Sequence, residues 1–215
     1  RRVVVVPEVW RESPVTPLQE VLERSHRLGF LGPGPVDPHV DHARAFARLV
    51  DVPPTLAADL GSGGGVPALV LAEGWPESQW WLIESRERRA AFLVEAVRAM
   101  GASDRITVLH QRAEDVANDE QRRGRCDLVT ARSFGPPPVT AECAAGLLRV
   151  GGRLVVSEPP VPTGDRWPRV PLAELGLEPE ATSEGRPRLQ ALRLREPCPA
   201  GFPRESGRAA RRPLW

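Results

Sequence analysis

A cluster of glycines between a predicted strand and a predicted helix is the feature that most constrains the fold. Residues 55–60 form a short apolar run that is typical of a buried strand, and residues 59–66 read Asp-Leu-Gly-Ser-Gly-Gly-Gly-Val. A helix is predicted over residues 66–74. In doubly wound α/β sheets, a glycine-rich turn at such a junction lets the backbone approach a bound nucleotide. We therefore expect an α/β fold with a ligand site at this turn.

Strands and helices continue to alternate after this glycine loop. Further strands are predicted at 80–84, 106–110, 127–131 and 153–157, and further helices at 88–100 and 139–148. Gly151-Gly152 is expected to break the last of these helices. The alternation predicts a parallel sheet with helices on both faces and right-handed connections. Residues 189–194 alternate in polarity and predict a late strand, whereas residues 159–187 are rich in proline and glutamate and only weakly patterned.

The residues before this alternation predict a helical N-terminal piece. In residues 15–29, apolar side chains and Ser25 recur at helical spacing, and Gly29 is expected to end the helix. Asp37-Pro38 predicts the cap and the first turn of a second helix, which Pro53-Pro54 closes.

The amino-acid composition excludes several kinds of chemistry. All 29 basic residues are arginine, so a Schiff base, a lysine general base and a P-loop lysine are excluded, and tyrosine is absent as well. The three cysteines form no CxxC pair, which indicates a reduced cytoplasmic protein without disulfides or a zinc site. His39 and His42 lie three residues apart on a predicted helix, but no third ligand is evident, so we expect no metal.

The glycine loop and a later glutamate indicate which ligand the sheet would bind. A dinucleotide-binding fingerprint needs glycine or alanine where Val66 stands, because helix and strand pack closely there. The loop instead has glycine at every second position after Asp59, a pattern typical of S-adenosylmethionine-dependent methyltransferases. Glu84, at the end of the second predicted strand, is placed to accept hydrogen bonds from both ribose hydroxyls. The alternative for Glu84 is an exposed charge at a strand end.

Several short motifs follow one another in a fixed order over residues 55–215. They are Asp59–Pro67, Glu84-Ser85 followed by Arg88–Leu93, Arg112-Ala113-Glu114, Ala131-Arg132-Ser133, and Phe202–Gly207 running into Arg211–Leu214. With this ordered set the chain resembles the 16S ribosomal RNA guanine-N7 methyltransferase family, also known as glucose-inhibited division protein B. It departs from the family at Ala68, where a second glycine is usual, and at Ser157–Pro160, where a lysine-glycine pair is frequent.

The resemblance implies a Rossmann-like class I S-adenosylmethionine methyltransferase fold, with a mostly parallel, doubly wound sheet and an antiparallel late strand. We expect a helical N-terminal extension at 1–54, the methyltransferase domain at 55–196 and an arginine-rich C-terminal tail at 197–215. The cofactor implied is S-adenosyl-L-methionine. The implied partner is ribosomal RNA in the small ribosomal subunit, and the protein is expected to be a cytoplasmic monomer that does not bind membranes.

The resemblance also assigns the residues of the cofactor site. The expected cofactor-binding residues are Asp59, Gly61, Gly63, Gly65, Val66, Glu84, Ala113, Glu114 and Arg132. Among them, Ala113 and Glu114 would hold the adenine end, and a backbone amide there can read an adenine edge. Instead of binding the cofactor, Glu114 could serve as a favourable charge at a helix N-terminus, and Arg132 could form a salt bridge to a neighbouring acid.

The chemistry of guanine N7 demands little of catalytic side chains. This nitrogen has a lone pair and no proton, so methyl transfer needs positioning and desolvation more than a general base. Arg132 is the one candidate catalytic residue. The sequence motifs typical of enzymes that methylate exocyclic amines or cytosine C5 are absent. Two alternatives remain: a small-molecule methyltransferase of the same fold, and a non-catalytic RNA-binding or ribosome-assembly protein.

Positive charge gathers at the C-terminal end of the chain. Residues 186–215 contain eight arginines and two glutamates, a net charge of +6, whereas the whole chain carries +1. Arginine pairs with phosphate and stacks on bases, so these residues suit an RNA partner. The expected RNA-binding residues are Arg204, Arg208, Arg211 and Arg212. The alternative is a solvated arginine-rich tail.

Overall fold

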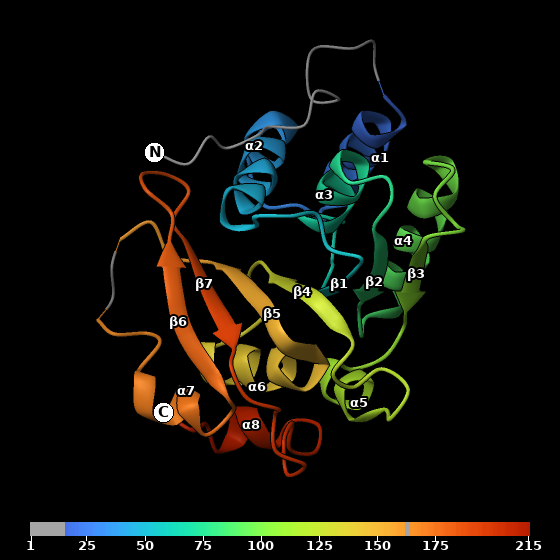
Figure 1. Cartoon of the computed structure of the whole chain (residues 1–215). Coiled ribbons are helices and arrows are strands. Elements are labelled where there is room, and N and C mark those ends of the chain that lie inside the picture. The colour runs from blue at the N-terminus through green and yellow to red at the C-terminus, as the bar shows by residue number, and fades with distance from the viewer. Residues whose placement is uncertain (1–15, 162–163) are drawn as a thin grey trace.

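A seven-stranded sheet runs through residues 16–161 and 164–215, the part of the chain that the computed structural model describes. The strand order is β3-β2-β1-β4-β5-β7-β6 (Figure 1). The strands are β1 (Leu56–Leu60), β2 (Gln79–Ile83), β3 (Ile106–Leu109), β4 (Cys126–Ala131), β5 (Leu148–Ser157), β6 (Leu177–Thr182) and β7 (Leu189–Leu194). Strands β1 to β5 pair in parallel, and β7 runs antiparallel to both β5 and β6. This confirms the expected mostly parallel, doubly wound sheet with an antiparallel late strand.

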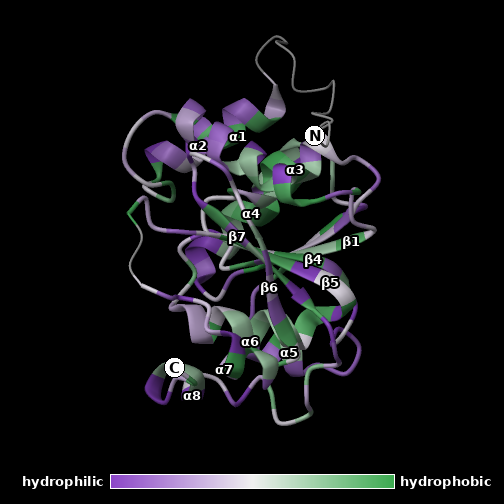
Figure 2. Ribbon diagram, turned by 60° about the vertical axis from the view of Figure 1, so that its left-hand side comes forward, coloured by the Kyte–Doolittle hydropathy of each residue, from purple (hydrophilic) through white to green (hydrophobic). Residues whose placement is uncertain are grey.

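Helices cover the sheet in two layers, with the apolar strands between them (Figure 2). One layer holds α1 (Pro17–Arg27), α2 (Val36–Phe46), the short 3₁₀ helix η2 (Ala47–Leu49), α3 (Ala68–Gly74) and α4 (Glu87–Ala99). The other holds α5 (Ala113–Asn118), α6 (Pro137–Leu147), α7 (Arg169–Ala173) and α8 (Arg208–Arg211). No helix in the described ranges is both long enough and apolar enough to cross a bilayer.

The N-terminal helices are built into the first of these layers. Leu22 of α1 and Phe46 of α2 are fully buried, and they belong to the same core cluster as Leu69 of α3 and Leu93 of α4. Over residues 16–54, the expected extension therefore shares its hydrophobic core with the sheet, while its residues 1–15 lie outside the described residues. Thr16 caps the start of helix α1, because its side chain accepts a hydrogen bond from the Gln19 amide, and Gly29 follows the helix with φ +71°.

Two expected boundaries are wrong. Asp37 does not cap α2, because the helix already starts at Val36 after Pro35 and has no side-chain cap. Gly151-Gly152 does not break α6, because that helix ends at Leu147 and both glycines lie inside β5. A Cβ atom at Gly152 would come within 2.8 Å of the Cys126 carbonyl oxygen of β4, so close strand packing requires glycine at this position.

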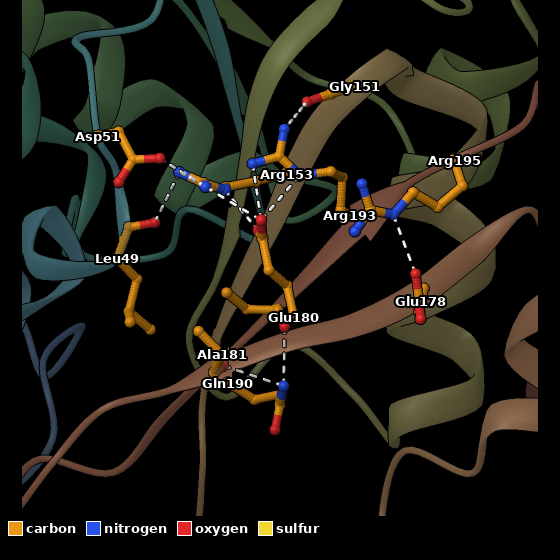
Figure 3. A network of polar contacts seen from close by, with 11 residues as sticks. Leu49, Asp51, Gly151, Arg153, Glu178, Glu180, Ala181, Gln190, Arg193 and Arg195 are labelled. Atoms are coloured by element: carbon orange, nitrogen blue, oxygen red, sulfur yellow. Dashed lines mark hydrogen bonds and ion pairs between the residues drawn. The ribbon is translucent and has the colours of Figure 1, made fainter.

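The weakly patterned stretch 159–187 contains β6, an edge strand that its charges conceal in the sequence. Glu180 of β6 accepts hydrogen bonds from Arg153 of β5 at 2.6 Å and from Arg193 of β7 at 2.9 Å, and Arg153 also reaches Asp51 (Figure 3). Burial acts to raise the pKa of Glu180, but the hydrogen bonds from these two arginines lower it to about 2. Ion pairs across the strands thus replace the apolar alternation that would have predicted this strand.

Candidate functional site

The glycine loop turns sharply over the carboxyl ends of β1 and β2. Gly61, Gly63 and Gly65 have φ values of +65°, +51° and +93°, which residues other than glycine rarely adopt. The amide of Ser62 donates to the Ile83 carbonyl of β2 at 3.0 Å, so the loop is fastened to the neighbouring strand. Ligands of such open sheets bind at this edge, which is where the sequence places the site.

Glu84 is buried directly after β2 and faces the loop. One carboxylate oxygen accepts the Gly63 amide at 2.9 Å, and the other accepts the Arg86 amide at 2.8 Å. Its exposed fraction is 4%, so the alternative of an exposed charge at a strand end is wrong. Each carboxylate oxygen can accept a second hydrogen bond, so both retain an acceptor site for a ligand hydroxyl.

Asp59, the first residue of the loop motif, holds an unsatisfied acceptor. Its Oδ1 accepts the Thr130 hydroxyl at 2.6 Å, whereas its buried Oδ2 has no hydrogen-bond partner among the described residues. The Ser62 hydroxyl donates to the main-chain carbonyl of Asp59 at 3.1 Å. Burial raises the pKa of Asp59 to about 7, against the opposing effect of the Thr130 hydrogen bond. Such an orphaned acceptor fits a ligand that brings a hydrogen-bond donor.

Arg132 lies directly after β4 and makes an unusual contact. Its Nη2 is 2.6 Å from Nδ1 of His39 on α2, although the two residues are far apart in the sequence. Among the described residues no carboxylate lies within salt-bridge distance of Arg132, which speaks against the salt-bridge alternative. The guanidinium is therefore held at the edge of the site without a salt bridge. Burial lowers the pKa of Arg132, and the charge of Asp59 opposes this effect through space.

The first turn of α5 places Ala113 and Glu114 after β3. Both residues are buried, and Oε1 of Glu114 accepts the Gly207 amide of the C-terminal segment at 3.0 Å. Glu114 also lies in the first turn of the helix, which agrees with its alternative interpretation as a charge at a helix N-terminus. One oxygen of Glu114 is thus used to hold the C-terminal segment, and the peptide backbone of these two residues is a second group that a ligand could contact.

The C-terminal segment 197–215 is fastened to the loop that follows α5 and to α6. Arg123 donates to the carbonyls of Cys198, Pro199 and Phe202 at 2.9, 2.9 and 2.5 Å. Arg204 pairs through Nη2 with the fully buried Glu142 of α6 at 2.7 Å. The guanidinium of Arg204 is therefore used inside the protein.

The remaining expected RNA-binding arginines differ from Arg204 in their exposure. Arg208 and Arg211 on α8, and Arg212 directly after it, are exposed. No carboxylate among the described residues forms an ion pair with these three side chains. Helix α8 begins next to the Gly207–Glu114 contact. The exposed part of the basic segment thus starts beside the carboxyl edge of the sheet.

Sequence reasoning missed two residues that join the N-terminal helices to the site. Ser25 of α1 donates to the Gly64 carbonyl of the glycine loop at 2.9 Å, and His39 contacts Arg132. A Cβ atom at Gly64 would meet the Ser25 hydroxyl at 2.5 Å and the Phe30 carbonyl oxygen at 2.8 Å, so only glycine fits there. The sequence feature that could have indicated Ser25 is its polar side chain on the apolar face of the helix, because a buried hydroxyl needs a hydrogen-bond partner.

Known proteins with similar sequences support one family. The family model described as GidB, rRNA small subunit methyltransferase G, matches residues 39–158. Ribosomal RNA small subunit methyltransferase G of Rubrobacter xylanophilus is 38% identical over 168 residues, which are 73% of this chain and 64% of that protein. The protein of the same name from Chloroflexus aggregans is 34% identical over 183 residues, 82% of this chain and 76% of that protein.

Solved structures with low sequence identity share the fold. An O-methyltransferase from Bacillus cereus, solved in complex with SAH, has a TM-score of 0.61 at 16% identity, covering 87% of this chain and 94% of that chain. An O-methyltransferase of Streptomyces achromogenes, involved in tomaymycin synthesis and solved with SAM, has a TM-score of 0.58 at 16% identity, covering 87% and 93%. With the strand order, the glycine loop and the extent of these sequence matches, the chain belongs to the rRNA small subunit methyltransferase G (GidB) family.

Proposed function

We propose that this protein binds S-adenosyl-L-methionine and transfers its methyl group to N7 of a guanine in 16S ribosomal RNA of the small ribosomal subunit. The proposal rests on a buried cradle at the carboxyl edge of the sheet, formed by the glycine loop, Glu84 and Asp59. In it, the Gly63 amide of the loop donates a hydrogen bond to Glu84, and Oδ2 of Asp59 has no hydrogen-bond partner among the described residues. Membership in the rRNA small subunit methyltransferase G family supports RNA as the substrate.

The chain has a suitable group for each part of the cofactor. Glu84 would accept the ribose hydroxyls, because both its oxygens keep a free acceptor site. Asp59 would accept a hydrogen bond from the ammonium group through its unsatisfied Oδ2. The backbone at Ala113 and Glu114 would read the adenine edge, and Arg132 supplies positive charge for a carboxylate or a phosphate.

The protein's contribution to catalysis is to position the reactants and to exclude water. When bound, the cofactor supplies an activated methyl group on its positively charged sulfur. Guanine N7 attacks with its lone pair and loses no proton, so no side chain has to act as a general base. The buried cradle, with Asp59 and Glu84 at 1% and 4% exposure, keeps the methyl donor fixed and away from competing water.

RNA binding is assigned to the exposed arginines of the C-terminal segment. Arg208, Arg211 and Arg212 offer permanent positive charges near the cofactor edge, and guanidinium groups pair with phosphates through two hydrogen bonds. Arg204 serves instead to dock this segment on Glu142. The small-subunit partner thus meets the protein at α8.

The cofactor proposal is tested by calorimetry with S-adenosylhomocysteine on the wild type and two matched variants. Glu84→Gln should weaken binding on the order of 10-fold or more, because a hydrogen bond from the ribose to a charged acceptor is lost. The exposed neighbour Glu87→Gln serves as the control and should bind like the wild type. A wild type that does not bind this compound would contradict the proposal.

The substrate proposal is tested by methyl transfer from radiolabelled cofactor. We expect label in 30S subunits or 16S ribosomal RNA from cells that lack this modification, at a guanine whose N7 methylation permits chemical strand scission. A free guanine nucleoside should accept little label. Cofactor binding combined with no labelling of either RNA substrate would reject the RNA proposal and favour a small-molecule methyltransferase.

A further inference from the structure

The contact between His39 and Arg132 determines which nitrogen of His39 carries a hydrogen. A guanidinium has five N–H donors and no acceptor, so Nδ1 of His39 has to be the acceptor in the 2.6 Å contact. The other ring nitrogen, Nε2, lies 3.2 Å from the Gly32 carbonyl oxygen, which can only accept. Both contacts are satisfied together by one form of the ring, the neutral tautomer with its hydrogen on Nε2.

We propose that His39 is a positioning residue that, as a neutral Nε2–H imidazole, holds the guanidinium of Arg132 in place to bind an anionic group of the substrates. This inference rests on the proposed function, because it concerns the same site. The anionic group is an oxyanion, supplied either by the carboxylate of the cofactor or by a phosphate of the RNA.

A neutral partner has an advantage over an acidic one at this position. A carboxylate would orient the guanidinium but would also cancel its charge. An imidazole nitrogen uses one of the five N–H groups and leaves the positive charge and the remaining donors for the ligand. In agreement with this role, Arg132 has no salt bridge to a carboxylate among the described residues.

The surroundings of His39 favour its neutral form. Helix α2 buries the ring to 7% exposure and places it against the Gly32 segment, where an added Cβ would come within 3.3 Å of the imidazole. The charged and titratable groups that act on the ring are Arg132 after β4, His26 of α1 and His42 on α2 itself. Burial first, and then the positive charge of Arg132, lower the pKa of His39, although its contacts with the Gly32 and Pro33 backbone oppose this.

The main test compares substitutions that remove or keep the acceptor. His39→Ala should raise the Kd for S-adenosylhomocysteine or the KM for 30S subunits on the order of 10- to 100-fold, as for a lost hydrogen bond to a charged group. A change in Kd identifies the cofactor carboxylate as the anion, and a change in KM identifies an RNA phosphate. His39→Asn, whose side-chain oxygen can accept from Arg132, should recover most of the loss. The exposed Glu87→Gln is again the control and should behave like the wild type.

A double-mutant cycle separates positioning from a general structural role. In an Arg132→Gln background, His39→Ala should have little further effect on Kd or KM, because Arg132 is the residue through which His39 acts. Fully additive losses, or equal losses in His39→Ala and His39→Asn, would overturn the proposal. Melting temperatures measured alongside should show that each variant is folded.

The tautomer itself is tested without activity. In the ¹⁵N-labelled protein, histidine NMR should show His39 with an unprotonated Nδ1 and a protonated Nε2 at neutral pH, and with a pKa below the ordinary histidine value. The Nδ1–H tautomer, or a charged ring at neutral pH, would overturn the inference even if the wild type methylates RNA. If instead the wild type binds no cofactor while the predicted tautomer is seen, the proposed function fails and the His39–Arg132 geometry stands.

Discussion

One buried carboxylate oxygen at the site destabilises the ligand-free protein. Oδ2 of Asp59 is buried without a partner among the described residues, and burial raises the pKa of this side chain to about 7. In the unfolded chain an aspartate titrates near 3.8. Between these values the folded state binds more protons than the unfolded state, so this residue destabilises the fold increasingly as the pH rises from about 4 to 7. A ligand that donates to Oδ2 would offset this destabilisation.

Replacing Asp59 by asparagine should therefore separate stability from binding. Asp59→Asn removes the buried charge, so the ligand-free variant should melt several degrees above the wild type at pH 8, and this difference should shrink towards pH 5. In a chain of this size about 1 kcal/mol corresponds to about 2–4 °C. Calorimetry with S-adenosylhomocysteine should show weaker binding for the same variant. A variant less stable than the wild type at pH 8 would contradict this account of Asp59.

A second residue-level prediction concerns the close approach between α1 and the glycine loop. Gly64→Ala should destabilise the protein by about 1–3 kcal/mol, because the new methyl group would collide with the Phe30 carbonyl oxygen and the Ser25 hydroxyl. Urea unfolding followed by circular dichroism measures the change. Gly201→Ala is the control, since a Cβ atom there meets nothing within 4 Å. Equal stability of the two variants would show that the loop can move away from α1.

At the level of elements, a buried ion pair docks the C-terminal segment on α6. Arg204 pairs with Glu142, which has no exposed surface, and the Arg204 amide donates to the same carboxylate at 2.6 Å. Arg204→Met should destabilise the protein by about 3–5 kcal/mol, because it leaves a buried charge without its partner. Adding Glu142→Gln should recover much of the loss. Arg195→Met, which breaks an exposed pair with Glu178, should change the free energy of unfolding by less than about 1 kcal/mol.

The elements that could be predicted from the sequence are those whose apolar pattern agrees with their burial. Strand β1 and helix α4 are examples, because β1 is apolar except for Asp59 and α4 has a regular apolar face that ends before Gly101. Strand β6 carries Glu180, which is paired with Arg153 of β5 and Arg193 of β7, so its sequence pattern resembles that of a solvated loop. Helix α5 has six residues, too few for a helical period to emerge from a charged stretch.

The site could be predicted to the extent that it is local in the sequence. The glycine loop and Glu84 lie at the ends of successive strands, so strand order alone brings them to one edge. The roles of His39, Ser25 and Glu142 depend on contacts between distant segments, and periodicity places these residues only on a helix face. For the same reason, Arg204 could not be distinguished in the sequence from the exposed arginines that follow it.

At the level of the whole molecule, the fold brings the cofactor cradle and a basic surface to neighbouring positions. Helix α8 lies in the same layer as α5 and α6 (Figure 1), and the contact between Gly207 and Glu114 sets its start beside the residues expected to hold adenine. The exposed arginines Arg208, Arg211 and Arg212 therefore face solvent close to the cofactor edge. The proposed RNA-binding surface thus begins next to the residues expected to hold adenine.

Charge reversal at α8 should weaken RNA binding and leave cofactor binding unchanged. Arg211→Glu combined with Arg212→Glu removes two exposed cations that have no structural partner among the described carboxylates, so S-adenosylhomocysteine should bind as before. The Kd for 16S ribosomal RNA should rise, and its dependence on salt should become less steep by about 0.7–0.9 per lost phosphate contact. Arg48→Glu with Arg98→Glu alters the net charge equally on the opposite helical layer and is the matched control. If both double variants weaken RNA binding alike, overall charge and not α8 determines affinity; if the α8 variant also loses the cofactor, the segment is structural and RNA contacts another face.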